Sequence, residues 1–286
     1  MTFHPYPAAC LRATLLALCA SLIAALPVHA DILISPQRVV LTNTNPQTVL
    51  SLHNPGTVER TYNLSWVERR LNEAGQLTDF KDGVNPRSIA SMVRFSPRRV
   101  MVKPGHTQTV RLSYRPPVGL APGEYRSHLR IGQEARADGS SGTPAASGEQ
   151  NGISFQLNAL MSFAVPVFVR HGGGTSTARI TAVQPIMIKR GEVEEPGLKV
   201  SLARDGEFSS YGRLVVYQQQ TASAPVEMIS EAGGVAMYAD ISGLTRELTL
   251  KPGARLEPGD WIRITYEGEG LERGQVYAER AIQIGK

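Results

Sequence analysis

Hydrophobic and polar residues alternate with a period of two along short stretches of the chain, for example over residues 48–53 and 62–68. Alternation of this kind predicts β-strands with one face turned toward a core. Strong turn signals separate the stretches, as at Asn54-Pro55-Gly56 and Lys103-Pro104-Gly105. Because the 3.6-residue period of a helix is missing throughout, the pattern predicts an all-β protein made of antiparallel sandwiches.

The same rhythm restarts in the second half of the chain. The predicted strands there are residues 180–188, 198–203, 213–219, 235–241, 247–250, 261–266 and 276–284. This number of strands in roughly 100 residues is typical of one immunoglobulin-like sandwich. We therefore predict two immunoglobulin-like domains, at residues 31–171 and 178–286, joined by a glycine-rich hinge at residues 172–177.

One segment combines a polar stretch with an unusually long strand pattern. Residues 134–152 carry no large apolar side chain and are predicted to form a mobile loop, because they bury too little surface to offset their ordering entropy. Residues 153–169 follow as the longest predicted strand. Its apolar side chains on one face include Phe155, Leu157, Ala159, Met161 and Phe163. This row either covers a core or forms an edge kept open for pairing with another protein.

The first thirty residues have the features of a secretory signal peptide. A single positive charge at Arg12 precedes an apolar run over residues 13–26, and a small residue, Ala30, marks the expected cleavage site. The run is too short for a stable membrane anchor, so we expect no membrane insertion. Both cysteines, Cys10 and Cys19, lie inside this segment. The mature protein is therefore expected to be exported and to fold without disulfides.

The remaining composition favours binding over catalysis. The net charge of +5 is mild, and the short basic runs lack interleaved aromatics, which argues against a nucleic-acid partner. The histidines after residue 30 show no metal-ligand spacing, so we expect no metal or cofactor. His171-Gly172-Gly173-Gly174 is similar to an esterase oxyanion loop, but the G-x-S-x-G elbow is missing. With aromatics at only 6%, an exported enzyme or sugar-binding module is the weaker alternative.

Several motifs of the first half follow one another in a distinctive order. They are Pro36-Gln37-Arg38-Val39-Val40-Leu41, Trp66-Val67-Glu68, Phe95-Ser96-Pro97, Pro104-Gly105 before Val110-Arg111-Leu112, and Gly123-Glu124-Tyr125-Arg126. Together with a signal peptide and a second sandwich, this ordered set resembles the periplasmic chaperones of the chaperone–usher pathway, the PapD-like family. The resemblance covers the first domain well, whereas the second domain matches in size and strand rhythm.

The resemblance implies a function as well as a fold. The two domains would be set at an angle in a boomerang-like arrangement, and the protein would bind and stabilise pilus subunits in the periplasm. It would lend its long strand, here called the donor strand, to a subunit and deliver that subunit to an outer-membrane usher. The donor residues, whose side chains would fill the subunit's pockets, would be Phe155, Leu157, Ala159, Met161 and Phe163. Whether the free protein covers this edge by forming a homodimer is left open. An alternative is an accessory chaperone for another secreted β-rich or coat protein.

The resemblance also assigns roles to charged residues. Arg38 would anchor the subunit's C-terminal carboxylate. The family usually supplies a second basic residue, a lysine near the end of the donor strand, but Pro166 stands at that place in this chain. Arg170 would pair between the domains with Glu124 and with an acid of the second domain, for which Glu267 is our prediction and Glu269 the other candidate.

Overall fold

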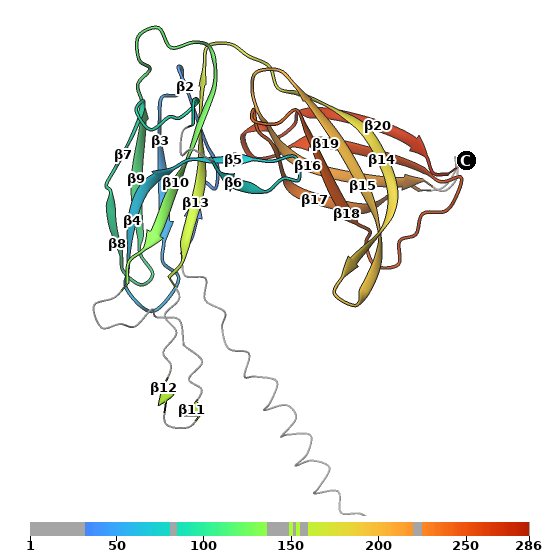
Figure 1. Ribbon diagram of the computed structural model, residues 1–286, viewed down its shortest axis with the longest axis horizontal. Coiled ribbons are helices and arrows are strands. Elements are labelled where there is room, and N and C mark those ends of the chain that lie inside the picture. Colours follow the sequence, from blue (N-terminus) through green and yellow to red (C-terminus); the bar gives the residue numbers. More distant parts are fainter. Residues whose placement is uncertain are drawn as a thin grey trace, which may run out of the picture.

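A computed structural model describes residues 32–80, 85–135, 149–150, 153–154, 160–219 and 225–285. The regular secondary structure of the described chain consists of β-strands, apart from one 3-10 turn, η1 (Gly270–Glu272). The strands form two sandwiches set at an angle to each other (Figure 1), as expected. The predicted signal peptide, residues 1–30, lies outside the described residues, and no helix among those described is long and apolar enough to cross a bilayer.

The first sandwich consists of a four-stranded and a five-stranded sheet. The four-stranded sheet has the order β1 (Leu33–Ser35), β3 (Gln47–His53), β9 (Thr107–Tyr114) and β7 (Val93–Ser96). The five-stranded sheet has the order β2 (Val39–Thr42), β13 (Ser162–His171), β10 (Gly123–Gln133), β4 (Arg60–Val67) and β8 (Arg99–Val102). Fully buried side chains such as Leu50, Tyr62 and Leu129 fill the space between the two sheets. The alternation in the sequence therefore reflects one core face per strand.

The second sandwich has three strands in one sheet and four in the other. The three-stranded sheet has the order β14 (Thr177–Arg190), β15 (Val193–Asp205) and β18 (Gly243–Thr249). The four-stranded sheet has the order β17 (Glu227–Met237), β16 (Ser210–Gln219), β19 (Trp261–Gly268) and β20 (Val276–Gln283). Leu198, Leu214 and Ile264 lie fully buried between these sheets. Six of the seven expected strands overlap these elements over most of their length. The strand expected at residues 235–241 shares only its first three residues with β17, which instead begins at Glu227.

The long strand of the first domain differs from the expected one over residues 153–169. Its described part, β13, starts at Ser162, and Ile153–Ser154 instead form the short strand β12, which pairs with β11 (Glu149–Gln150). The candidate donor residues Phe155, Leu157 and Ala159 lie outside the described residues, as does most of the predicted loop over residues 134–152.

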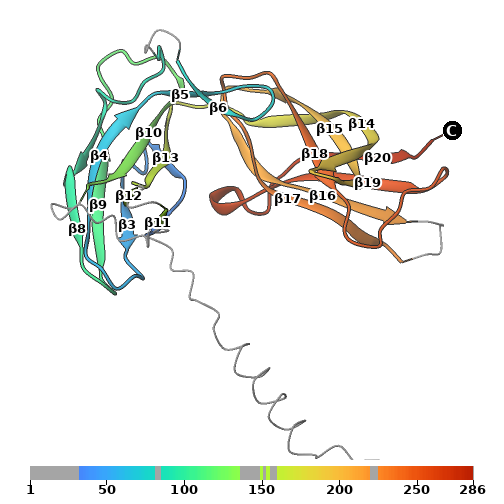
Figure 2. The same ribbon diagram turned by 60° about the horizontal axis from the view of Figure 1, so that its bottom comes forward.

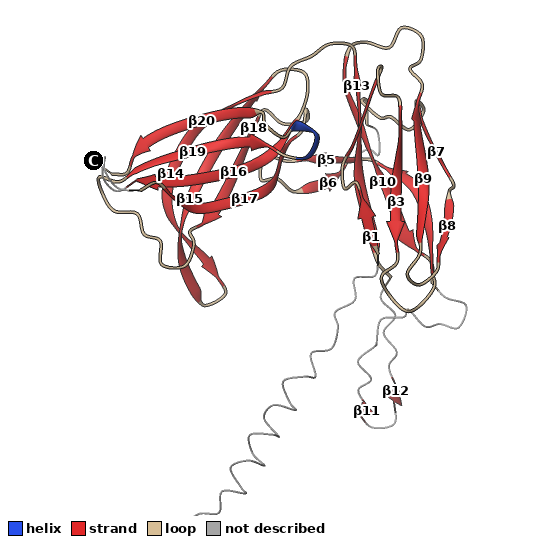
Figure 3. Ribbon diagram, turned by 180° about the vertical axis from the view of Figure 1, so that it is seen from behind, coloured by secondary structure: helices blue, strands red, loops and turns tan. Residues whose placement is uncertain are grey.

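A two-stranded hairpin extends from the first sandwich and contacts the second. It comprises β5 (Arg69–Leu71) and β6 (Leu77–Asp79), which leave the first domain after β4 and reach the second (Figures 2 and 3). The backbone N–H of Leu71 donates to Asp240 Oδ2 at 3.0 Å, and the Leu71 side chain joins the second domain's core. The hairpin, together with the connection between β13 and β14, positions the two domains around a cleft.

Candidate functional site

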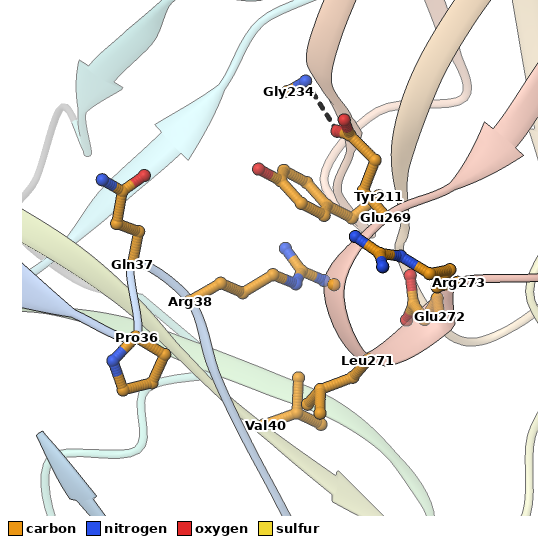
Figure 4. Close-up of a pocket in the computed structure, with 11 residues that line it drawn as sticks. Pro36, Gln37, Arg38, Val40, Tyr211, Gly234, Glu269, Leu271, Glu272 and Arg273 are labelled. Carbon is orange, nitrogen blue, oxygen red and sulfur yellow. Dashed lines mark hydrogen bonds between the residues drawn. The ribbon is translucent and has the colours of Figure 1, made fainter.

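A hollow of about 680 Å³ lies between the two sandwiches. The first domain lines it with Val40 of β2 and with residues 36–38 just before that strand, and the second domain with Tyr211, Gly234 and residues 269–273. Figure 4 shows the Arg38 side chain extending from the segment before β2 toward the second domain. Because its walls come from both domains, the shape of the hollow depends on how the domains are held together.

Aromatic rings enclose the guanidinium of Arg38. Its Cζ lies 3.8 Å from the ring centre of Phe168 on β13 and 5.0 Å from that of Tyr211 on β16. The ring centre of Tyr238, which follows β17, lies 5.9 Å from the same atom. Aromatic faces attract a cation, and stacking holds its side chain in one orientation. The arrangement fixes a positive charge at the base of the cleft.

One side of this guanidinium lacks a hydrogen-bond partner. Nη2 donates to Ser209 Oγ at 3.0 Å, but Nη1 is buried and unpaired among the described residues. Burial lowers the pKa of Arg38, because the charged form loses solvation, while Tyr238 and the carboxylates of Glu124 and Glu272 oppose this effect. A buried donor without an acceptor is costly, and an incoming anion would relieve that cost. The site is therefore suited to binding a carboxylate.

A charged network behind Arg38 joins the two domains. Arg170 on β13 lies 3.1 Å from Glu124 of β10 through Nε and 2.7 Å from Glu272 of the second domain through Nη2. Ser209 connects this network to Arg38, because its Oγ donates to Glu124 at 2.9 Å. Burial disfavours the charge on Arg170, but the attraction of Glu124 and Glu272 outweighs it and raises the pKa of Arg170.

The second acid of this network is Glu272, and our prediction of Glu267 is wrong. Glu267 instead lies 2.9 Å from Arg213, the residue opposite it on the neighbouring strand β16. Glu269, the other acid considered from the sequence, accepts the backbone N–H of Gly234 at 2.9 Å. The difference arises from η1, which places Glu272 toward the first domain while Glu267 remains within the sheet.

A second guanidinium, that of Arg273, lines the same hollow. It follows η1, is exposed, and forms no ion pair with any described carboxylate. The neighbouring acids already have partners, since Glu272 binds Arg170 and Tyr277 and Glu269 binds Gly234. Two arginines from different domains therefore border one cavity.

The described candidate donor residues lie at the beginning of β13. Met161 is 43% exposed, and Phe163 is partly buried against the first domain's core. Further along the same face, Val165, Val167 and Val169 are core residues. Within the described residues, the far end of the apolar row covers the core, whereas Met161 is exposed.

The edge of β13 is only partly covered by a neighbouring strand. On one side β13 pairs with β10 from His171 back to Ser162. On the other side, in the described part of the chain, β2 pairs with Val167–Arg170 alone. Residues 162–166 therefore have backbone groups that face away from β10 and have no partner strand among the described strands. This gap is contiguous with the exposed Met161.

Several residues of the site could not be found from the sequence. Phe168 falls on the polar face of the predicted strand, and Ser209, Tyr238 and Glu272 lie far away in the chain. Among the described residues, no cluster of three or more histidine, cysteine or acidic side chains could hold a metal ion. The arrangement offers anion binding and strand pairing.

No known family model and no curated protein matches the sequence. Similar solved structures include the SafB chaperone of Salmonella enterica with SafA pilin, at 11% identity over 91% of this chain and 99% of that chain, with a TM-score of 0.44. The E. coli chaperone DraB matches at 9% identity over 89% and 96%, also at 0.44. The CsuC–CsuE chaperone–tip adhesion subunit complex of Acinetobacter baumannii matches at 13% identity over 90% and 99%, at 0.42. The chain is thus similar in fold to chaperones of pilus subunits, the class that its motifs resemble.

Proposed function

We propose that this protein is a periplasmic chaperone that binds pilus subunits and delivers them to an outer-membrane usher. The observation that carries the proposal is the guanidinium of Arg38, fixed between aromatic rings with a buried, unpaired Nη1 at the cleft. A free C-terminal carboxylate is an anion that every protein subunit carries. Its binding at Arg38 would give one fixed starting point for the bound chain.

Arg273 is our proposed second cation of this anchor. Pro166 occupies the place at which a basic residue is expected, but Arg273 reaches the hollow from the opposite domain. A carboxylate has two oxygens and can accept donors from two guanidiniums at once. The anchor would then form only when both domains are correctly placed, which the Glu124–Arg170–Glu272 network favours.

The bound subunit would continue along the open edge of β13. Starting from the cleft, an added strand would meet the backbone of residues 162–166, which has no partner strand on that side in the described chain. Met161 and Phe163, together with Phe155, Leu157 and Ala159 outside the described residues, would fill the subunit's apolar pockets. Backbone hydrogen bonds would supply affinity and the alternate side chains specificity. The same edge could pair with a second copy when no subunit is present.

Co-expression tests this proposal directly. The protein would be produced with each secreted β-rich protein encoded nearby, and the polypeptide that co-purifies from the periplasm would be identified. A pilus subunit that becomes soluble only with the chaperone supports the proposal. Its recovery should fall when the subunit's C-terminus is extended by several residues, since its carboxylate then leaves the anchor. Recovery of a coat protein or another β-rich protein instead would favour the accessory-chaperone alternative.

A further inference from the structure

We propose a second binding site on the first domain, outside the cleft, for an extended acidic segment of a partner protein. It is a hollow of about 670 Å³ beside strand β7, which we call the β7 hollow. The side chains that matter are Trp66, Arg94, Phe95, Arg98, Arg111 and Ser113. The proposal is independent of the pilus-chaperone function, because none of these residues lines the cleft.

Three arginines border the β7 hollow without carboxylate partners. Arg94, Arg98 and Arg111 are exposed, and none forms an ion pair with a described acid. Arg94 lies opposite Ser113, and Arg111 lies opposite Ser96, so Arg94 and Arg111 are diagonal neighbours on one sheet face. Like charges at such positions repel each other. A negatively charged ligand between them would turn this repulsion into attraction.

Aromatic side chains form the apolar part of the hollow. Trp66 and Phe95 meet edge to face with ring centres 5.2 Å apart. The guanidinium of Arg98 lies 5.4 Å from the ring centre of Phe95, so charge and apolar surface adjoin. No acidic residue lines the hollow among the described residues. This combination fits a segment that carries carboxylates and an apolar side chain within a few residues of each other.

The shape of the site favours an extended peptide over a small anion. The hollow is far larger than a phosphate or carboxylate group and falls within the size range of organic ligands. It runs along β7, which is an edge strand and pairs with β9 alone among the described strands. Neighbouring side chains of an added strand would point to opposite faces, placing acids over Arg94 and Arg111 and an apolar residue near Trp66.

The β7 hollow is separated from the cleft. Figures 1 and 3 both place β7 on the side of the first domain away from the second domain. A partner bound there would leave Arg38 and β13 accessible. The protein could therefore hold a ligand in its cleft and an acidic partner on its outer face at the same time.

Tryptophan fluorescence offers a local test. The chain contains two tryptophans, so Trp261→Phe leaves Trp66 as the single reporter. The probe is the capped peptide acetyl-Glu-Val-Glu-Phe-Asp-Val-Glu-amide, with a counterpart carrying glutamine and asparagine at the acidic positions. We expect the acidic peptide to change Trp66 emission and to bind more weakly as salt increases. Calorimetry on the same samples measures binding even if the emission change is small.

Two charge variants distinguish binding at the β7 hollow from non-specific electrostatic attraction to the protein surface. Arg94→Gln combined with Arg111→Gln should weaken peptide binding about tenfold. Arg115→Gln, an exposed arginine just after β9 and outside the hollow, should change it less than about twofold. Equal binding of the neutral peptide, no binding by either method, or equal loss with the control would overturn the proposal. An emission change of the same size with inorganic phosphate or phosphatidylglycerol vesicles would also overturn it, in favour of a small-anion or membrane site.

Discussion

Arg38 of the first domain donates a hydrogen bond of 3.0 Å from Nη2 to Oγ of Ser209 in the second domain. The same Oγ donates to Glu124, which also binds Arg170. The proposed anchor and the interdomain ion pairs are therefore parts of one hydrogen-bonded chain. A ligand that moves Arg38 would change the contacts that hold the two domains in place. The relative position of the domains would in turn change the affinity for the ligand.

Replacing Arg38 should strongly weaken subunit binding without unfolding the protein. Arg38→Ala removes the bond to Ser209 and the contacts with the aromatic rings, but it also removes a buried donor that has no partner among the described residues. We therefore expect the free energy of unfolding to fall by about 1–2 kcal/mol. Subunit affinity should fall by about 10- to 100-fold, because a charged hydrogen bond is lost. Arg38→Lys keeps the charge but not the planar fork and should be intermediate. Thermal unfolding and periplasmic subunit recovery measure both effects, and normal recovery with Arg38→Ala would contradict the anchor.

Removing Arg273 should weaken the same binding from the other side of the cleft. Arg273→Gln has no described ion pair to break, so its unfolding should match that of the unmodified protein. We expect about a tenfold loss of subunit affinity. Arg255→Gln, an exposed arginine outside the hollow, is the matched control. Equal affinities for the Arg273 and Arg255 variants would show that Arg38 works without Arg273.

Glu272 and Glu267 provide a matched pair for the interdomain contact. Glu272→Gln weakens the pair with Arg170, whose side chains are 13% and 16% exposed, and should lower the free energy of unfolding by about 2 kcal/mol. Glu267→Gln affects the more exposed pair with Arg213 and should cost less than about 1 kcal/mol. Urea denaturation compares the two variants. A larger effect at Glu267 would be inconsistent with the network described above.

Strands that bury one face were predictable from their own residues. The stretch over residues 48–53 corresponds to β3, Gln47–His53, because its alternating side chains meet a single core. The hairpin of β5 and β6 was not predicted, since each strand has three residues and little alternation. Its stability comes from Leu71 and the second domain, which local sequence does not reveal. The extension of β14 and β15 to the turn at Gly191 was missed because those residues pair with each other outside the core.

The candidate site was predictable only where the family resemblance reached. Arg38, Glu124 and Arg170 follow motifs of the first domain, and all three lie at the cleft or directly behind it. Glu272 and Arg273 depend on η1, whose place opposite Arg38 follows from the angle between the domains. Five residues separate Glu267 from Glu272, and nothing in their local sequence distinguishes them. Contacts between domains can be identified only once the three-dimensional arrangement of the domains is known.

A charge at Met161 should block strand pairing while leaving the fold intact. The side chain is 43% exposed, so Met161→Glu should change the free energy of unfolding by less than about 1 kcal/mol. Burying the new carboxylate in an apolar pocket of a subunit would be costly, and we expect subunit recovery to be lost. Met187→Glu, at a 59% exposed position in the second domain, is the control. Marked destabilisation by Met161→Glu alone would indicate a core role instead.

His128 should make the protein less stable in acid. It lies on β10 opposite Pro166 of β13, fully buried, with both ring nitrogens unpaired among the described residues. Burial lowers the pKa of His128 to about 4, and the nearby Arg126 and Arg69 act in the same direction while Asp240 opposes them. An unfolded histidine has a pKa of about 6.5, so the neutral form is favoured by folding.

The stabilisation from His128 is complete above about pH 6.5 and is lost as the pH falls toward 4. The full difference amounts to about 3 kcal/mol. Urea denaturation of the unmodified protein and of His128→Leu at pH 7 and pH 4.5 should show a smaller acid-induced loss in the variant. His106→Gln, at an exposed position, should retain the loss of the unmodified protein. Identical pH dependence in His128→Leu and the unmodified protein would mean that His128 titrates normally in the folded state.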